Sequence, residues 1–115
     1  MRSAFVLWGR DVWWTRRRLD RLARAVRCMG WVAEPRYGDV PPMLRVYAAD
    51  VPCIGDSVVA VRGVDAVWWF RSSTGTLLAP CTHPALAAIR MDALLTPWVA
   101  AARASPRGGE ADPSS

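Results

Sequence analysis

The stretch that decides the fold covers residues 57–81 and reads SVVAVRGVDAVWWFRSSTGTLLAPC. Its apolar runs are rich in valine, tryptophan and phenylalanine, which suit a pleated, half-buried surface. Two short polar segments, residues 62–65 and 72–75, divide the stretch into three runs. Gly75 stands where a four-residue hairpin loop often requires a left-handed residue. The stretch therefore predicts three strands, and strands joined by such short loops have to be antiparallel.

Two further strands are expected before this stretch. Residues 31–37 predict an edge strand, because Pro35 has no amide hydrogen to donate to a central ladder. Residues 43–48 (MLRVYA) predict another strand, followed by an irregular connection over residues 49–56 around Pro52 and Gly55. The alternation in MLRVYA separates two sets of side chains, Met43, Arg45 and Tyr47 on one face and Leu44, Val46 and Ala48 on the other.

A helix is expected on each side of the strands. Residues 11–29 predict the first, with Asp11 as its cap and Gly30 as its stop signal. The residues expected to be buried on its apolar stripe are Leu19, Leu22, Val26 and Met29, and those expected to be exposed opposite are Arg17, Arg21 and Arg24. Residues 84–103 predict the second helix, with Pro84 in its first turn and a kink or restart at Pro97.

The order of these elements predicts a single α+β domain over residues 11–104. It consists of an N-terminal helix, an antiparallel meander of about four to five strands and a C-terminal helix, packed as a two-layer sandwich. Residues 1–10 form a short apolar extension in this interpretation. Residues 105–115 (SPRGGEADPSS) have the composition of a disordered tail.

Positive charge is concentrated at the N-terminal end of the chain. All 15 basic residues are arginine. Residues 1–36 hold nine arginines and three acidic residues, a net charge of +6, whereas residues 37–115 hold six arginines and seven acidic residues, a net charge of −1. The sequence also lacks asparagine and glutamine, which indicates high-GC codon usage. Arginine in place of lysine is then only weak evidence for phosphate recognition.

The sequence predicts a cytoplasmic protein without a cofactor. No apolar run approaches the ~20 residues of a membrane span, and apolar residues 4–8 are shorter than the ~7–15-residue core of a signal peptide. Three cysteines without a C-x-x-C pair indicate neither a disulfide framework nor a zinc ribbon. Neither a phosphate-binding glycine loop nor an H-E-x-x-H motif is present in the sequence.

The leading candidate site is a surface of tryptophan and arginine side chains that binds another protein. Trp68 and Trp69 are adjacent, so in a strand they point to opposite faces and one of them points outward. Exposed aromatic patches mark partner surfaces. The alternative is that the terminal elements cover both sheet faces. The candidate partner-binding residues are Trp13, Trp14, Arg17, Arg21, Arg24 and Trp69.

Two other functions remain open. The basic helix could bind phosphates while its tryptophans stack on bases, although a strand at Trp31 argues against a helix-turn-helix. Cys81 and His83, at a strand-to-helix junction, could form a small thiol enzyme, or a metal site with Cys53 that lacks a fourth ligand. The simpler interpretation of Cys81 and His83 is a buried thiol and a helix cap.

Two segments of the central region read VYAADVPCIGDSV (residues 46–58) and WWFRSSTGTLLAPC (residues 68–81). They resemble a group of small actinobacterial proteins, some of which are encoded beside helix-turn-helix regulators. The resemblance covers about the central half of the chain and carries over no functional residues. It implies a bacterial, cytoplasmic accessory protein. We therefore expect a non-enzymatic accessory or regulatory protein that acts through protein–protein contacts, and homo-oligomerisation stays open.

Overall fold

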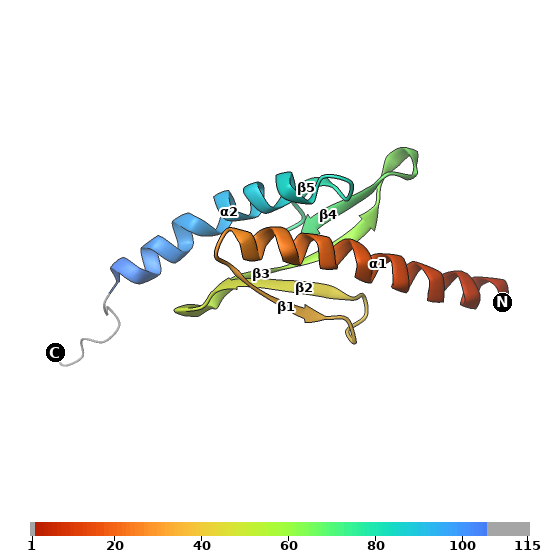
Figure 1. Ribbon diagram of the computed structural model, residues 1–115, viewed down its shortest axis with the longest axis horizontal. Coiled ribbons are helices and arrows are strands. Elements are labelled where there is room, and N and C mark those ends of the chain that lie inside the picture. Colours follow the sequence, from red (N-terminus) through yellow and green to blue (C-terminus); the bar gives the residue numbers. More distant parts are fainter. Residues whose placement is uncertain (1, 106–115) are drawn as a thin grey trace.

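The computed structural model describes the backbone of residues 2–105 and the side chains of residues 12–105. Two helices flank a five-stranded antiparallel sheet whose strands pair in chain order. The elements are α1 (Arg2–Cys28), β1 (Val32–Arg36), β2 (Met43–Ala48), β3 (Val51–Arg62), β4 (Trp68–Ser72), β5 (Leu77–Pro80) and α2 (Pro84–Ala104). The helices lie side by side on one face of the sheet (Figure 1). The predicted α+β meander is confirmed, whereas coverage of both sheet faces is not realised.

The face of the sheet that meets the helices carries the core. On β2 the alternation is as predicted, because Leu44, Val46 and Ala48 are buried while the residues between them are half-buried. The register continues this buried face across the sheet, since Val58 lies opposite Leu44 on one side and Ser72 on the other. Phe70, at the centre of β4, is fully buried.

Both helices cover this face with apolar side chains. Leu19, Leu22 and Val26 of α1 are fully buried, as expected. The expectation for Met29 is wrong, because this residue is 41% exposed. Helix α1 ends at Cys28, and Gly30 turns the chain with a φ of +94°. Met29 therefore leaves the helical stripe before it can reach the core.

The start of the first helix differs from the prediction. Helix α1 begins at Arg2, so Asp11 lies inside it and does not cap it, and residues 2–10 belong to the helix rather than to a separate extension. The apolar residues 4–8 are compatible with helix, and the glycine at position 9 costs only about 1 kcal/mol relative to alanine. The expected tail, residues 105–115, lies outside the described residues apart from Ser105.

The predicted irregular connection at residues 49–56 is also wrong, because β3 begins at Val51. Ala48 pairs with Val51 while Tyr47 pairs with Gly55, so residues 52–54 form a bulge with no partners on β2. A bulge tolerates Pro52, which has no amide hydrogen. Gly55 is required by close approach, since a Cβ there would lie 2.5 Å from the carbonyl oxygen of Val46. Proline and glycine here mark a bulge within a strand.

The loops otherwise agree with the sequence pattern. Gly75 in the β4–β5 turn has a φ of +93°, as predicted. The β3–β4 loop contains a three-residue 3₁₀ turn, Val64–Ala66, in which Asp65 and Ala66 adopt left-handed conformations. Helix α2 continues through Pro97 as one element, so of the predicted kink or restart the restart does not occur.

One face of helix α2 belongs to the core. By length and composition alone it could cross a membrane, since a window of it has a mean hydropathy of 1.3. Five of its side chains are buried against the sheet and α1, namely Ala87, Ala88, Met91, Leu95 and Val99. Its apolar composition is therefore explained in part by packing.

The helix assignment predicts a large difference between two apolar positions of the same segment. Leu22→Ala is expected to lower the free energy of unfolding by ~2–5 kcal/mol, because it leaves a cavity beneath α1. The control Met29→Ala removes a half-exposed side chain and should cost less than ~1 kcal/mol. Urea denaturation measures both, and equal losses would contradict the assignment.

Candidate functional site

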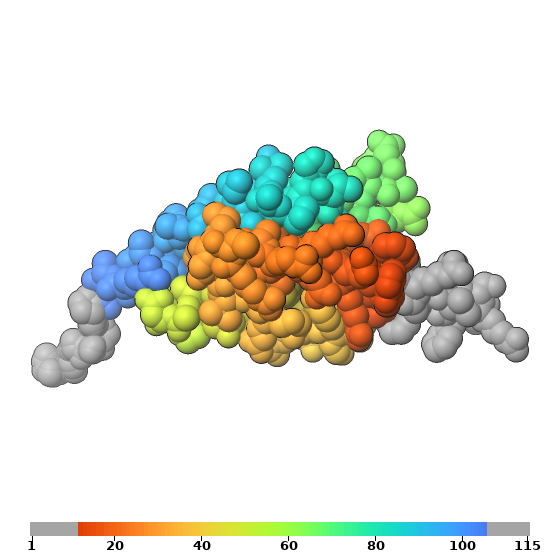
Figure 2. Space-filling view, in the orientation of Figure 1, coloured from red at the N-terminus to blue at the C-terminus, as the bar shows by residue number. Residues whose placement is uncertain are grey.

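Part of the predicted tryptophan–arginine surface lines a groove where the β3–β4 loop approaches α1. The groove has a volume of about 370 Å³ and also contacts the segment between β5 and α2. We call it the Trp/Arg groove, and its lining residues are Trp14, Arg17, Arg18, Arg21, Ala66, Val67, Trp68, Cys81 and Thr82. Figure 2 shows α1 (orange) lying across the front of the molecule, where much of its length is open to solvent.

Stacking on aromatic rings orients two of the groove arginines, Arg17 and Arg18. The guanidinium of Arg18 lies 4.5 Å from the ring centroid of Trp68 and 5.9 Å from that of Trp14. The guanidinium of Arg17 lies 5.1 Å from the ring of Trp13, which packs edge-on against Trp14 at 4.8 Å. Such contacts hold the guanidinium plane while leaving its N–H donors free at the edge. The groove therefore presents oriented donors for an anion.

No described carboxylate neutralises the groove arginines. Among residues 12–105 the ion pairs are Arg36 with Glu34 and Arg103 with Asp50, and none involves an arginine of the groove. Asp20, on the same helix, instead accepts a 2.6 Å hydrogen bond from the Tyr37 hydroxyl. Burial, with a further contribution from Asp20, raises the pKa of Tyr37 above its ordinary value. The groove arginines are therefore unpaired within the described part of the chain.

The predicted site residues separate into three groups. Trp14, Arg17 and Arg21 line the groove, and Trp13 stacks beside it, with Trp13 and Trp14 52% and 48% exposed. Arg24 is exposed but lies outside the groove lining. Trp69 lies on the face of the sheet opposite the helices, because Trp68 and Phe70 on either side of it contact the core.

Sequence reasoning missed Arg18 and Trp68 as members of the groove. The helical spacing between Trp14 and Arg18 was a usable signal, because residues four apart on a helix are neighbours. The choice between Trp68 and Trp69 was not available from alternation alone. It depends on which face of β4 the helices cover, and Phe70 decides this by its burial.

Cys81 and His83 do not form an activated pair. Cys81 is buried in the floor of the groove, and this burial raises the pKa of its thiol to about 12, although the charge of Arg18 opposes the shift. His83 is exposed at the N-cap of α2, and its Nδ1 lies 2.9 Å from the hydroxyl of Thr82. Either Thr82 or His83 was expected to cap α2; His83 occupies the N-cap position, but its side chain makes no capping hydrogen bond.

The geometry also gives no support to a metal site with Cys53. Within the part of the chain that the structure describes, no group of three histidine, cysteine or acidic side chains is arranged to hold a metal ion. Cys53 lies in the β3 bulge, far along the sheet from the groove that contains Cys81.

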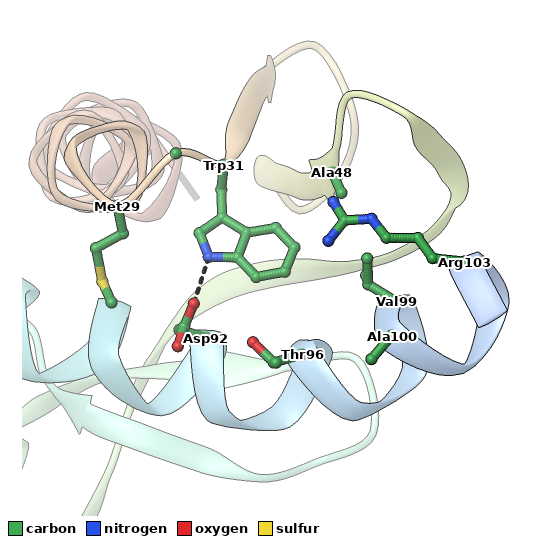
Figure 3. A pocket seen from close by; sticks show the side chains of 9 residues that line it. Met29, Trp31, Ala48, Asp92, Thr96, Val99, Ala100 and Arg103 are labelled. Carbon is green, nitrogen blue, oxygen red and sulfur yellow. Dashed lines mark hydrogen bonds between the residues drawn. The ribbon is translucent and has the colours of Figure 1, made fainter.

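A second cavity, of about 230 Å³, lies where the end of α1 meets α2 (Figure 3). The Trp31 indole donates a 2.9 Å hydrogen bond to Asp92, which joins the start of β1 to α2. Arg103, at the other end of this cavity, donates two hydrogen bonds of 2.7 and 2.8 Å to Asp50 and holds the pKa of that carboxyl below its ordinary value. Trp31 is paired with Asp92 and Arg103 with Asp50, so these polar groups already have partners. We therefore interpret the cavity as a gap in the packing between the helices and not as a binding site.

Comparisons with known proteins add no further constraint. No family model matches the chain, and neither a curated protein nor a solved structure matches it. The interpretation of the Trp/Arg groove therefore rests on its own geometry.

The three cysteines are expected to react with a thiol-alkylating reagent at very different rates at neutral pH. Cys28 and Cys53 are exposed and should be labelled quickly, whereas Cys81 should be labelled slowly because its thiol is buried and protonated. Mass spectrometry of digested protein separates the three sites. His83→Ala should leave the rate at Cys81 unchanged, and fast, His83-dependent labelling would contradict the structural assignment.

Proposed function

We propose that this protein is a small, non-enzymatic accessory protein of the cytoplasm that binds an acidic segment of a partner protein in the Trp/Arg groove. The observation that carries the proposal is the set of three groove arginines, Arg17, Arg18 and Arg21, which have no carboxylate partner among the described residues. Arginines that stack on tryptophan and are open to solvent are frequent anchors of protein interfaces.

The shape and lining of the groove favour a short acidic segment over a purely polar ligand. Trp14 and Trp68 supply apolar area on either side of Arg18, and Val67 closes the loop side. A segment that carries carboxylates and one apolar or aromatic side chain can use both kinds of contact. Bidentate arginine–carboxylate bonds supply geometric specificity, while buried aromatic area supplies much of the affinity.

Nucleic-acid binding is the alternative, and the exposed pair Trp13 and Trp14 is the feature that favours it. Stacking of bases on such side chains is common in proteins that bind single strands. Against it, the groove is short, and β1 follows α1 where a helix-turn-helix would place its second helix.

The proposal is tested by fluorescence anisotropy with three labelled probes of equal length. These are a glutamate-rich peptide containing one tryptophan, the same peptide with every glutamate replaced by glutamine, and oligothymidine. We expect the acidic peptide to bind and the glutamine peptide to bind at least about tenfold more weakly, because the groove arginines lose their charged partners. Tighter binding of oligothymidine than of the acidic peptide would favour the nucleic-acid alternative and contradict the proposal.

Matched charge reversals locate the binding surface. The triple variant Arg17→Glu, Arg18→Glu, Arg21→Glu should lose at least about tenfold in affinity for the acidic peptide, since it reverses every arginine of the groove lining. The control Arg24→Glu, Arg36→Glu, Arg71→Glu makes the same change in net charge at exposed positions outside the groove lining and should retain most of the affinity. Equal losses of affinity in the two variants would show that peptide binding depends only on the net charge of the protein, and would contradict binding in the groove.

Truncation of single tryptophans tests whether the peptide binds in the groove or elsewhere on α1. Trp14→Ala should weaken peptide binding more than Trp13→Ala does, because Trp14 lines the groove and Trp13 lies beside it. Circular dichroism controls for folding, and a larger loss from Trp13→Ala would place the interface elsewhere on α1.

A further inference from the structure

A separate pocket lies beneath the C-terminal half of α2, at the end of β4 opposite the Trp/Arg groove. It has a volume of about 360 Å³, which lies within the ~300–1,000 Å³ usual for small-molecule sites. We call it the Asp56 pocket, and its lining residues are Cys53, Ile54, Gly55, Asp56, Ser73, Thr74, Leu94, Leu95 and Trp98.

A buried carboxylate gives this pocket its charge. Asp56 is only 9% exposed, and its Oδ1 accepts hydrogen bonds from the amides of Ser57 (2.7 Å) and Ser73 (3.1 Å) and from the Ser73 hydroxyl. No described residue donates a hydrogen bond to Oδ2, and no described arginine pairs with Asp56. A carboxylate buried without a cation is unfavourable unless something else compensates its charge.

The turn beside Asp56 is held by its own hydrogen bonds. The Ser72 amide donates to the Thr76 carbonyl at 2.9 Å, and the Thr76 amide donates to the Ser72 hydroxyl at 3.2 Å. The hydroxyls of Ser72 and Thr74 lie 2.8 Å apart. With Asp56 bonded to Ser73, the polar side of the pocket is ordered before any ligand arrives, which lowers the entropic cost of binding.

The opposite side of the pocket is apolar and open. Trp98 is 67% exposed and Leu94 is 37% exposed, although both lie on a helix whose other face is in the core. An indole face attracts a cation through its quadrupole, and an alkyl chain can pack on leucine. The pocket thus combines one anionic group with an aromatic and aliphatic wall, and none of the described basic residues lines it.

We propose that the Asp56 pocket binds an organic cation of the alkylammonium or alkylguanidinium class. The cationic head group donates to Asp56 Oδ2 and lies against the indole of Trp98, while the alkyl chain packs on Leu94. The site is independent of the Trp/Arg groove, because the two share no lining residue and carry opposite charge.

The experiment is an NMR titration of the full chain with agmatine and n-butylammonium, with 1-butanol as the neutral isostere. The indole N–H resonance of Trp98 is assigned from the spectrum of Trp98→Phe. We expect saturable shifts of this resonance with both cations and none with 1-butanol. Equal shifts with 1-butanol, or no saturable shift with either cation, would overturn the proposal.

Two variants and a matched control test the roles of the residues. Asp56→Asn should weaken agmatine binding at least about tenfold, because it removes the charge that the head group contacts. Trp98→Ala changes an exposed side chain, so it should weaken binding, measured by calorimetry, even if Asp56→Asn fails to fold. Trp13→Ala, an exposed tryptophan outside the pocket, should have no effect. A folded Asp56→Asn variant with unchanged affinity would overturn the proposal.

One further arm distinguishes the source of the cation. A short glycine-flanked peptide with a single arginine competes with agmatine if the natural occupant is an arginine side chain of a polypeptide, and it does not compete if the site accepts only free small cations. Competition and its absence are both consistent with a pocket that binds the cationic head group. Displacement of agmatine by the peptide with glutamine in place of arginine would overturn the proposal, because that peptide carries no cation.

Discussion

The burial of one face of the meander beneath two helices is the constraint on which the rest of the structure depends. Phe70, Leu44 and Val58 are fully buried on that face, and both helices pack their apolar stripes on it. Because side chains alternate along a strand, a slip of one residue in β4 would exchange its core set for its solvent set. The burial of Phe70 therefore also fixes Trp68 on the side of the helices and Trp69 on the opposite side.

Trp68 forms the sheet side of the groove whose other side is the basic helix α1. Arginines on an exposed helix are ordinarily mobile, and surface charges of this kind contribute little by themselves. Here the ring of Trp68 reaches the guanidinium of Arg18 from the sheet, while Trp14 reaches it from the preceding turn of α1. The order of the groove is therefore a consequence of the sheet register as well as of the helix sequence.

The face of the sheet away from the helices remains half-exposed, and its apolar residues cover one another across the strands. Val61 pairs with Trp69, and Val32 pairs with Tyr47. Cross-strand pairs of aromatic and β-branched side chains of this kind stabilise a sheet by roughly 0.2–1 kcal/mol each. This pairing accounts for apolar side chains on a face that neither helix covers.

The sequence predicted the elements that depend on local pattern and missed those that depend on tertiary contact. Alternation was sufficient for β2 and for the buried face of the meander, and helical spacing was sufficient for Leu19, Leu22 and Val26. The start of α1 differs from the prediction because Asp11 lies inside the helix and does not cap it. The bulge at residues 52–54 and the exposure of Met29 follow from strand pairing and chain direction, which no local pattern records. For the same reason, the sequence identified Arg17 and Arg21 but not Arg18 and its stacking partner Trp68.

The two candidate sites lie at opposite ends of β4 because charge is tolerated only where the core ends. Between Trp68 and Ser72 the inner face of this strand is filled by Phe70, and an unpaired charge there would be strongly unfavourable. At the Trp68 end the strand meets a helix whose arginines remain partly in water, so positive charge gathers without pairing. At the Ser72 end the ladder gives way to a turn whose Ser73 amide and hydroxyl donate hydrogen bonds to the Asp56 carboxylate. One strand thus separates a surface lined by arginines from a pocket that contains a buried carboxylate.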